Sequence, residues 1–186
     1  MIPLALNPAN LRIGLAGAGQ PALRRLAALR AAGAQPVLFA ADATLAAEPN
    51  ALPFPPAAAA LAELHVLYIA GLEAAQYVPL AEAARAGKIL VNVEDVPEFC
   101  DFCAVAELRR GDLLLTVSTG GTAPGLAGII RRALEDYFPP EWAGRVAEVA
   151  ALRQGWRAEQ IPMAERAKRI GALVRERCWL PCPTAK

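Results

Sequence analysis

Histidine is nearly absent from this sequence, and its scarcity excludes several kinds of chemistry. His65 is the one histidine among 186 residues. It begins an apolar run that predicts a core strand, where a histidine is more often a buried, hydrogen-bonded side chain than a catalyst. Ser-His-Asp catalysis and metal sites built from several histidines are therefore nearly excluded.

Cysteine is also scarce. The four cysteines are too few for a disulfide scaffold in a chain of this length. Cys100 and Cys103 form a CxxC pair, but Cys178 and Cys182 are too near the C-terminus to complete a convincing zinc set with it. The pair also does not open a helix after an early strand, as a thioredoxin-type motif does. We interpret these cysteines as structural or incidental and predict no resident metal.

Long apolar runs and a strong charge imbalance are lacking as well. No apolar stretch reaches the roughly 18 residues that a membrane span needs, and the N-terminus has no basic segment of the kind that begins a secretory signal. We therefore expect a cytoplasmic chain with no membrane partner. The formal net charge of +1 is too small to indicate a nucleic-acid partner.

The charge is nevertheless unevenly spread. Residues 141–186 hold nine basic and five acidic residues, whereas the preceding residues carry an acidic excess. This basic tail indicates either an anionic partner or a solvated helix face.

What the sequence does contain is an alternation of strands and helices in its first half. The runs at 65–70 and 88–93 are continuously apolar, which is typical of strands covered on both faces of a parallel sheet. We therefore predict an α/β fold with a Rossmann-type doubly wound parallel sheet. Its expected strands are 11–17, 36–40, 65–70 and 88–93, with helices 21–32 and 73–86, which should end at Gly33 and Gly87.

This alternation stops after residue 95. We expect the Pro/Ala-rich segment near 53–60 to be a loop followed by a short helix, and 96–110 to be irregular. A strand at 113–118 and helices at 123–137, 141–156 and 162–177 should follow. The predicted domains are a Rossmann domain over 1–95, a dimerisation region over 96–140 and a helical domain over 141–186. Helix 123–137 has an apolar stripe that one small sheet does not need, so we expect a symmetric homodimer.

A glycine turn follows the first expected strand. Gly17, Gly19 and Ala22 fit the pattern GxGxxA, in which backbone N–H groups at a helix N-terminus suit a pyrophosphate. Asp42 follows Gly17 by 25 residues, where an acid binds the ribose hydroxyls of NAD and repels the 2′-phosphate of NADP. The predicted dinucleotide-binding residues are Gly17, Ala18, Gly19, Gln20, Pro21, Ala22 and Asp42. The alternative is a small-residue turn kept for packing alone, and Arg24 and Arg25 either neutralise phosphate or face solvent.

Asp95 closes the apolar strand that ends at Val93. Ligands of open α/β sheets bind outside the carboxyl ends of the strands. Asp95 is therefore a candidate general acid or base, or an oxygen ligand for a metal. A turn-forming or helix-capping aspartate is equally compatible with this position.

A second strand-to-helix turn carries hydroxyl groups and glycines. Ser118, Thr119, Gly120 and Gly121 could bind a carboxylate or phosphate, or Thr119 could be a plain turn residue. Thr122 is placed to cap the following helix, with Pro124 in its first turn.

These motifs together resemble one enzyme family. The order GxGxxA, V-N-V-x-D at 91–95 and S-T-G-G-x-x-P-x-L-A at 118–127 is similar to that of precorrin-2 dehydrogenases/sirohydrochlorin ferrochelatases, the sirohaem synthases. The resemblance covers roughly residues 8–160. It implies a homodimer that oxidises precorrin-2 to sirohydrochlorin with NAD and often inserts Fe2+ to give sirohaem.

The resemblance also implies residue roles. Asp95 matches the acid that removes a proton in dehydrogenation and acts in chelation, and residues 118–121 match a loop implicated in tetrapyrrole binding. The basic tail would steer the eight carboxylates of precorrin-2.

Two departures bear on the cofactor. The family usually has three consecutive glycines where this chain has Gly17-Ala18-Gly19, and it reads A-T-D-D where this chain has Ala70-Gly71-Leu72-Glu73. We therefore expect weak NAD binding and still weaker NADP binding. The alternatives are a ferrochelatase-only or degenerate tetrapyrrole- or nucleotide-binding homologue, or an NAD(P)-dependent oxidoreductase acting on another small molecule.

Overall fold

The computed structural model describes residues 2–180, so Cys182 lies outside the described residues. The chain forms two compact units that divide between Ala104 and Val105. The division falls in the stretch where the strand–helix alternation was expected to stop. The predicted domain ends at 95 and 140 stay predictions.

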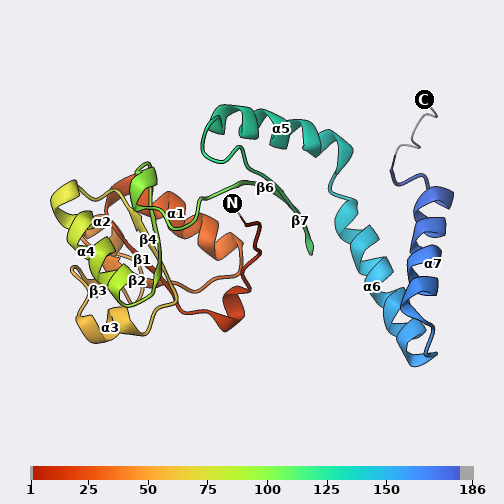
Figure 1. Ribbon diagram of the computed structural model, residues 1–186, viewed down its shortest axis with the longest axis horizontal. Coiled ribbons are helices and arrows are strands. Elements are labelled where there is room, and N and C mark those ends of the chain that lie inside the picture. The colour runs from red at the N-terminus through yellow and green to blue at the C-terminus, as the bar shows by residue number, and fades with distance from the viewer. Residues whose placement is uncertain (1, 181–186) are drawn as a thin grey trace. The chain divides into compact units, whose positions relative to one another are not determined.

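The first unit is built around a five-stranded parallel sheet of order β3-β2-β1-β4-β5 (Figure 1). From β1, the chain adds two strands toward one edge and then crosses back to add two toward the other. The crevice of a doubly wound sheet lies at such a reversal, between β1 and β4. The Rossmann-type prediction is confirmed. The strands are β1 (Ile13–Gly17), β2 (Val37–Ala40), β3 (Leu52–Pro53), β4 (Val66–Ala70) and β5 (Leu90–Val93).

Helices cover both faces of this sheet. Side chains of β4 alternate between the faces, so Val66 packs in one core cluster with Leu26 of the first helix, while Leu67 packs in the other with Leu80. All four side chains are at most 6% exposed. The helices of this unit are α1 (Gly19–Ala31), α2 (Ala43–Ala46), α3 (Ala58–Ala62) and α4 (Ala74–Ala86), with 3-10 turns at Pro8–Asn10 and Pro97–Phe99.

The second unit is a hairpin with three helices. Strands β6 (Ala106–Arg110) and β7 (Leu113–Val117) pair antiparallel, and α6 (Trp142–Ala158) and α7 (Met163–Glu176) lie side by side (Figure 1). Helix α5 (Pro124–Tyr137) packs on the hairpin. Within the described part of this unit, Leu108 and Ala127 are the only buried hydrophobic residues. This unit therefore leaves most of its apolar side chains at least partly accessible.

Several local expectations were wrong. The stretch 96–110 is not all irregular, because β6 occupies its end as the partner of β7. Likewise the Pro/Ala-rich segment contributes the edge strand β3, where a proline is tolerated because one side of the strand has no partner. The short helix predicted after this segment is α3.

The predicted ends of the two long helices fared differently. Gly33 has φ of 82° after α1, as a C′ glycine should. After α4, however, Lys88 rather than Gly87 takes the left-handed conformation, with φ of 61°. Helix α4 therefore ends in a Schellman-type motif whose left-handed residue is Lys88, one residue later than predicted. The hydrogen bond of this motif runs from the N–H of Ile89 to the carbonyl of Ala84 at 3.0 Å.

The expectation of a buried histidine was also wrong. His65 precedes β4 and is exposed. Its Nδ1 accepts a hydrogen bond from the N–H of Arg12 at 3.0 Å, so the side chain joins the starts of two neighbouring strands.

Candidate functional site

The glycine turn joins the end of β1 to the start of α1. Gly19 has φ of 60°, a conformation that favours glycine. At Gly17, a Cβ would lie 2.3 Å from the carbonyl oxygen of Ala70 and 2.9 Å from the Cβ of Ala22. The small residues therefore have a packing role, whatever else the turn binds.

Few backbone N–H groups of this turn are free. The N–H of Ala18 donates to Ala70 O at 3.1 Å, and that of Gly19 donates to the Asp42 carboxylate at 2.9 Å. Pro21 has no N–H. Among the described residues, that leaves the N–H of Gln20 without a partner at the helix N-terminus. The turn can thus offer an anion one free N–H together with the helix dipole.

Asp42 joins the starts of two helices. One carboxylate oxygen accepts the N–H of Gly19, and the other accepts the N–H of Leu45 at 3.0 Å as the N-cap of α2. These bonds, that to Leu45 above all, lower the pKa of the carboxyl below its ordinary value. Asp42 is therefore charged at neutral pH. Each of its oxygens keeps a second lone pair that could accept a ribose hydroxyl.

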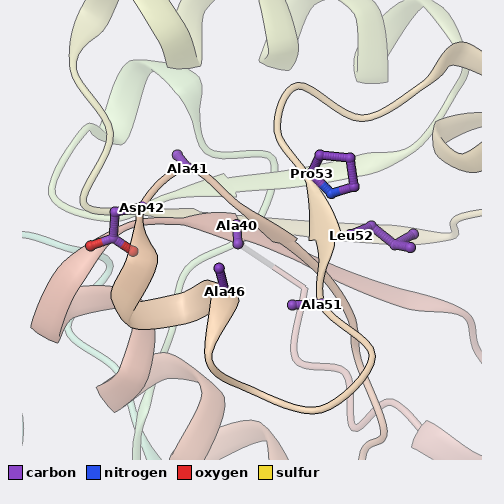
Figure 2. A pocket seen from close by; sticks show the side chains of 7 residues that line it. All are labelled: Ala40, Ala41, Asp42, Ala46, Ala51, Leu52 and Pro53. Atoms are coloured by element: carbon purple, nitrogen blue, oxygen red, sulfur yellow. The ribbon is translucent and has the colours of Figure 1, made fainter.

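A cavity of about 410 Å³ opens beside Asp42. Among the residues that line this cavity, Figure 2 shows Asp42 on one side and Leu52 and Pro53 on the other. The lining side chains are mostly small and apolar, so the cavity suits a flat group with apolar faces, such as a nucleotide base. Of these lining residues, only Asp42 was predicted from the sequence. The run of alanines after β2 was a usable signal, because small side chains leave room for a cavity. The lining residues are Ala40, Ala41, Asp42, Ala46, Ala51, Leu52 and Pro53.

Asp95 lies just past the carboxyl end of β5. It is exposed, and its φ of 62° is in the left-handed region that aspartate tolerates better than most residues. Within residues 2–180, its carboxylate has no hydrogen bond or ion pair. A charged group without a structural partner is available to act on a ligand.

The loop that carries Asp95 is fastened along the free edge of β5. Asp101 bonds to Val91 twice, through its N–H to the Val91 carbonyl at 2.8 Å and through its carboxylate to the Val91 N–H at 2.9 Å. Buried Asn92 donates to the carbonyl of Phe102 at 2.8 Å. Asn92 therefore holds this loop through its side-chain amide. The loop is therefore anchored close behind Asp95.

Cys100 belongs to the same fastening. Its thiol donates to the carbonyl of Val93 at 3.1 Å, and burial raises its pKa. This supports a structural role for Cys100, whereas Cys103 and Cys178 are exposed. Across residues 2–180, no group of three or more His, Cys, Asp or Glu side chains is arranged to hold a metal ion.

Arg25 turns toward the carboxyl end of β5. It lies 3.8 Å from the carboxylate of Glu94, with its guanidinium 5.3 Å from the ring centre of Tyr68. Its side chain is 19% exposed. Of the two predicted alternatives, a merely solvent-facing Arg25 is therefore wrong, and Arg25 places a cation next to the residue that precedes Asp95.

The turn at 118–121 belongs to the second unit, whereas Asp95 and the glycine turn belong to the first. The Thr119 hydroxyl accepts the N–H of Ala123 at 3.1 Å, and the Thr122 hydroxyl donates to the Thr119 carbonyl at 2.6 Å. The predicted N-cap role of Thr122 is wrong, because Ala123 is the N-cap and Thr119 supplies the side-chain acceptor. Pro124 does begin the helix.

The loop before Ala123 is shaped by its glycines. Gly120 and Gly121 have φ of 67° and 84°, and no atom lies within 4 Å of a Cβ built on Gly121. The N–H of Gly120 bonds to the Ser118 hydroxyl at 3.2 Å. The turn is thus open on the side of Gly121.

In the part of the chain that is described, none of the helices combines the length and apolar character needed to cross a membrane.

Known proteins match the chain in sequence. A family model described as "Putative NAD(P)-binding" matches residues 4–106. The siroheme synthase of Nitrosococcus oceani is 31% identical over 176 residues, covering 91% of this chain and 37% of that protein. That of Methylococcus capsulatus is 35% identical, covering 90% and 36%. The chain thus spans little more than a third of these relatives.

Shorter and structural matches agree. The siroheme biosynthesis protein met8 of Schizosaccharomyces pombe is 34% identical over 96 residues, covering 52% of this chain and 36% of that protein. A solved structure named SirC, precorrin-2 dehydrogenase, superposes with a TM-score of 0.69 at 18% identity, covering 94% of this chain and 89% of the other. The fold is shared, and the relatives carry the names that the sequence resemblance implies.

Proposed function

We propose, from the premise that this chain belongs to the NAD(P)-binding family, that it is an NAD-dependent precorrin-2 dehydrogenase. The observation that carries the proposal is the exposed carboxylate of Asp95, which has no partner among the described residues and lies at the carboxyl edge of a parallel sheet that also bears a glycine turn. The name of the structural neighbour, SirC, precorrin-2 dehydrogenase, supplies the substrate, and the names of the sequence relatives place it in siroheme biosynthesis.

The residues around the β1–α1 turn fit a dinucleotide. The close packing at Gly17 fixes the turn, the N–H of Gln20 has no partner among the described residues, and the cavity next to Asp42 suits a base. The residues of the turn between β1 and α1 would hold the pyrophosphate, and the Asp42 carboxylate would hold the ribose hydroxyls. When bound, NAD supplies a hydride acceptor.

Oxidation of precorrin-2 to sirohydrochlorin removes one hydride and one proton. Asp95 accepts the proton, since a carboxylate without a partner can approach the substrate C–H or N–H directly. The guanidinium of Arg25 and the carboxylate of Glu94 set the charges next to Asp95. Bound NAD+ would accept the hydride, and Asp95 would pass the proton to solvent.

The carboxylates of the tetrapyrrole need donors and positive charge. The turn Ser118, Thr119, Gly120 and Gly121 offers an open approach to backbone N–H groups at the start of α5. The basic tail adds an attractive field that speeds encounter with a polyanion. We propose that this turn and the basic tail bind the substrate rather than the cofactor.

Fe2+ insertion is the second proposed reaction. Sirohydrochlorin releases two pyrrole N–H protons as the metal enters, and Asp95 is suited to accept them. Here Fe2+ is a substrate, and sirohaem is the product. A ferrochelatase-only protein is the competing proposal, and one observation favours it: only one N–H of the glycine turn is free within the described residues, which limits affinity for a dinucleotide.

We also propose a homodimer in the cytoplasm. The dimer is supported by α5, whose Leu126, Ile129 and Tyr137 are 50%, 56% and 62% exposed along one stripe. The second unit has too small a core of its own to cover them.

Absorbance spectroscopy tests the function. Purified protein is incubated with precorrin-2 and NAD+, and the conversion of the tetrapyrrole spectrum is followed together with NADH. Conversion that depends on NAD+ is expected. No change with authentic substrate contradicts the dehydrogenase, while a separate incubation with sirohydrochlorin and Fe2+ tests chelation.

Calorimetric titration tests the cofactor. Weak NAD+ binding and weaker NADP+ binding are expected because Asp42 repels a 2′-phosphate. Tighter NADP+ binding would overturn the role of Asp42, and binding of neither would favour the chelatase.

A further inference from the structure

The ion pair between Arg25 and Glu94 is loose, although both side chains are largely buried. The two side chains are 19% and 22% exposed, and their closest N–O distance is 3.8 Å. The other three ion pairs described in the first unit have N–O distances of 2.7, 2.8 and 3.0 Å. At 3.8 Å the charges attract each other without a hydrogen bond. Within residues 2–180, neither of the two side chains makes any hydrogen bond.

The ring of Tyr68 holds the guanidinium of Arg25 in this place. The guanidinium lies 5.3 Å from the centre of the ring, and the ring itself packs edge-on against Phe102 with their centres 5.3 Å apart. A ring face attracts a cation but does not take up its N–H donors as a carboxylate would. The five N–H donors of Arg25 are therefore held next to Glu94 with their bonding capacity unused.

The other polar side chain on this side of β5 is fully engaged. Glu94 continues the strand, because its N–H still bonds to β4 at 2.9 Å, so its side chain lies on the same side as that of Asn92, two residues earlier. Asn92 is 5% exposed and donates to the carbonyl of Phe102 at 2.8 Å. The structural polar group is thus satisfied, whereas the charged pair next to it is not. Such a pair calls for a partner that the protein itself does not supply.

We propose that Arg25 binds a carboxylate of the tetrapyrrole substrate beside Asp95. The inference rests on the proposed function, which supplies a substrate with carboxylates around its ring. Guanidinium and carboxylate match as a bidentate pair, whose two hydrogen bonds fix the distance and direction of approach. Because Glu94 directly precedes Asp95, a substrate held by Arg25 has one edge of its ring next to the Asp95 loop.

The position of the pair favours the substrate over the cofactor. The guanidinium lies over Tyr68 of β4 and next to Glu94, which follows β5. The glycine turn follows β1, and β4 separates β1 from β5 in the sheet. Arg25 therefore directs its charge away from the strand whose turn would hold the pyrophosphate.

Glu94 has the opposite effect in this proposal. Its carboxylate already faces the cation, so a substrate carboxylate that arrives at Arg25 also meets a negative charge. Loss of the Arg25 charge should therefore weaken substrate binding, and loss of the Glu94 charge should strengthen it. An ion pair that only stabilised the fold would not give effects of opposite sign.

Absorbance titration with sirohydrochlorin at fixed ionic strength compares the wild-type protein with three variants. We expect Arg25→Gln to raise the Kd roughly tenfold, the loss typical of a hydrogen bond between charged groups. Glu94→Gln should lower the Kd about two- to fivefold, because the pair is partly exposed. Arg24→Gln removes the same charge from the next position of α1, where the side chain is exposed. Its Kd should stay within about twofold of wild type, because salt screens an exposed charge.

Calorimetry with NAD+ separates the substrate from the cofactor. Arg25→Gln should bind NAD+ as the wild type does. A rise in the Kd for NAD+ as large as that for sirohydrochlorin would overturn the inference, because Arg25 would then act on the cofactor or on the fold.

Equal sirohydrochlorin binding by Arg25→Gln and Arg24→Gln would also overturn the inference and leave the proposed function standing. Failure of the wild type itself to bind sirohydrochlorin would overturn both. If Arg25→Gln does not fold, as judged by circular dichroism, Glu94→Gln decides. Its Kd for sirohydrochlorin must then lie below the wild-type value, and a Kd equal to or above that value contradicts the inference.

Discussion

At the scale of single residues, Asp95 combines an exposed carboxylate with a left-handed backbone at the carboxyl end of β5. This backbone matters for testing its role, because alanine there would add strain to the loss of charge. Asparagine tolerates the same conformation and removes only the charge.

Asp95→Asn should therefore lower kcat by about 10²- to 10⁴-fold, the usual contribution of a general acid or base. The thermal midpoint should hardly change, because the carboxylate has no partner among the described residues. Steady-state oxidation of precorrin-2 measures kcat, and circular dichroism measures the thermal midpoint. Glu98→Gln, in the same loop, is the control for loss of a negative charge. A rate for Asp95→Asn near wild type would remove Asp95 from the mechanism.

Asp42 makes a pH-dependent contribution to stability. Its folded-state pKa is lowered from the ordinary value of 3.8, chiefly by the backbone N–H of Leu45. A lowered pKa stabilises the folded state above the unfolded value, and this stabilisation is lost as the pH falls through the folded value.

Asp42→Asn should consequently lower the urea midpoint at pH 7, and the difference from wild type should shrink below about pH 4. Asparagine keeps one oxygen that can cap α2 but presents an NH2 group to the N–H of Gly19, so the change of the difference with pH, rather than its size at pH 7, reports the charge. Urea unfolding at pH 7 and pH 3 measures both midpoints. An equal difference at the two pH values would show that the charge plays no part.

At the scale of elements, the end of α4 carries a strained residue. Lys88 adopts φ of 61° at the position where helices that end in a left-handed residue usually have glycine. A left-handed conformation costs about 1–2 kcal/mol for a residue with a Cβ. Glycine removes this cost but gains about 0.4–1 kcal/mol of freedom in the unfolded chain.

Lys88→Gly should therefore raise the free energy of unfolding by about 0.5–1 kcal/mol. Lys88→Ala, which keeps the Cβ, should leave it almost unchanged. Chemical denaturation of the two variants separates backbone strain from loss of the lysine charge. Equal stabilisation by both variants would assign the effect to the charge.

At the scale of the whole molecule, the apolar stripe of α5 should determine assembly. Burying one isoleucine or leucine contributes about 1.5–3 kcal/mol, so the exposed members of the stripe favour association with a second copy. Ile129 is 56% exposed and lies near the middle of the stripe.

Light scattering should give twice the chain mass of 19.6 kDa for the wild type. Ile129→Glu should shift the protein toward the monomer, because a charge would be buried in the interface. Arg132→Glu, on the same helix but outside the stripe, should remain dimeric. A wild-type mass near that of one chain at micromolar concentration contradicts the dimer.

The sequence by itself determined the elements whose signals are local. Continuous apolar runs produced β4 and β5, and the glycine turn with Asp42 could be located because each depends on a few neighbouring residues. The family resemblance likewise assigned a role to Asp95 from the short motif at 91–95. What the local pattern could not show was pairing: β6 was missed because its identity as a strand comes from its bonds to β7.

Only the tertiary structure decided which polar groups are already engaged. Asp42 proved to hold the N–H of Gly19, and Gly71 proved to stand against the carbonyl of Ala18, although 23 and 53 residues separate these pairs. No periodicity records such contacts, because they arise when parallel strands bring their carboxyl ends to one edge of the sheet. His65 and Lys88 lie at the opposite, amino ends of β4 and β5. The exposure of His65 and the left-handed conformation of Lys88 also depend on where neighbouring elements begin and end rather than on the residue type.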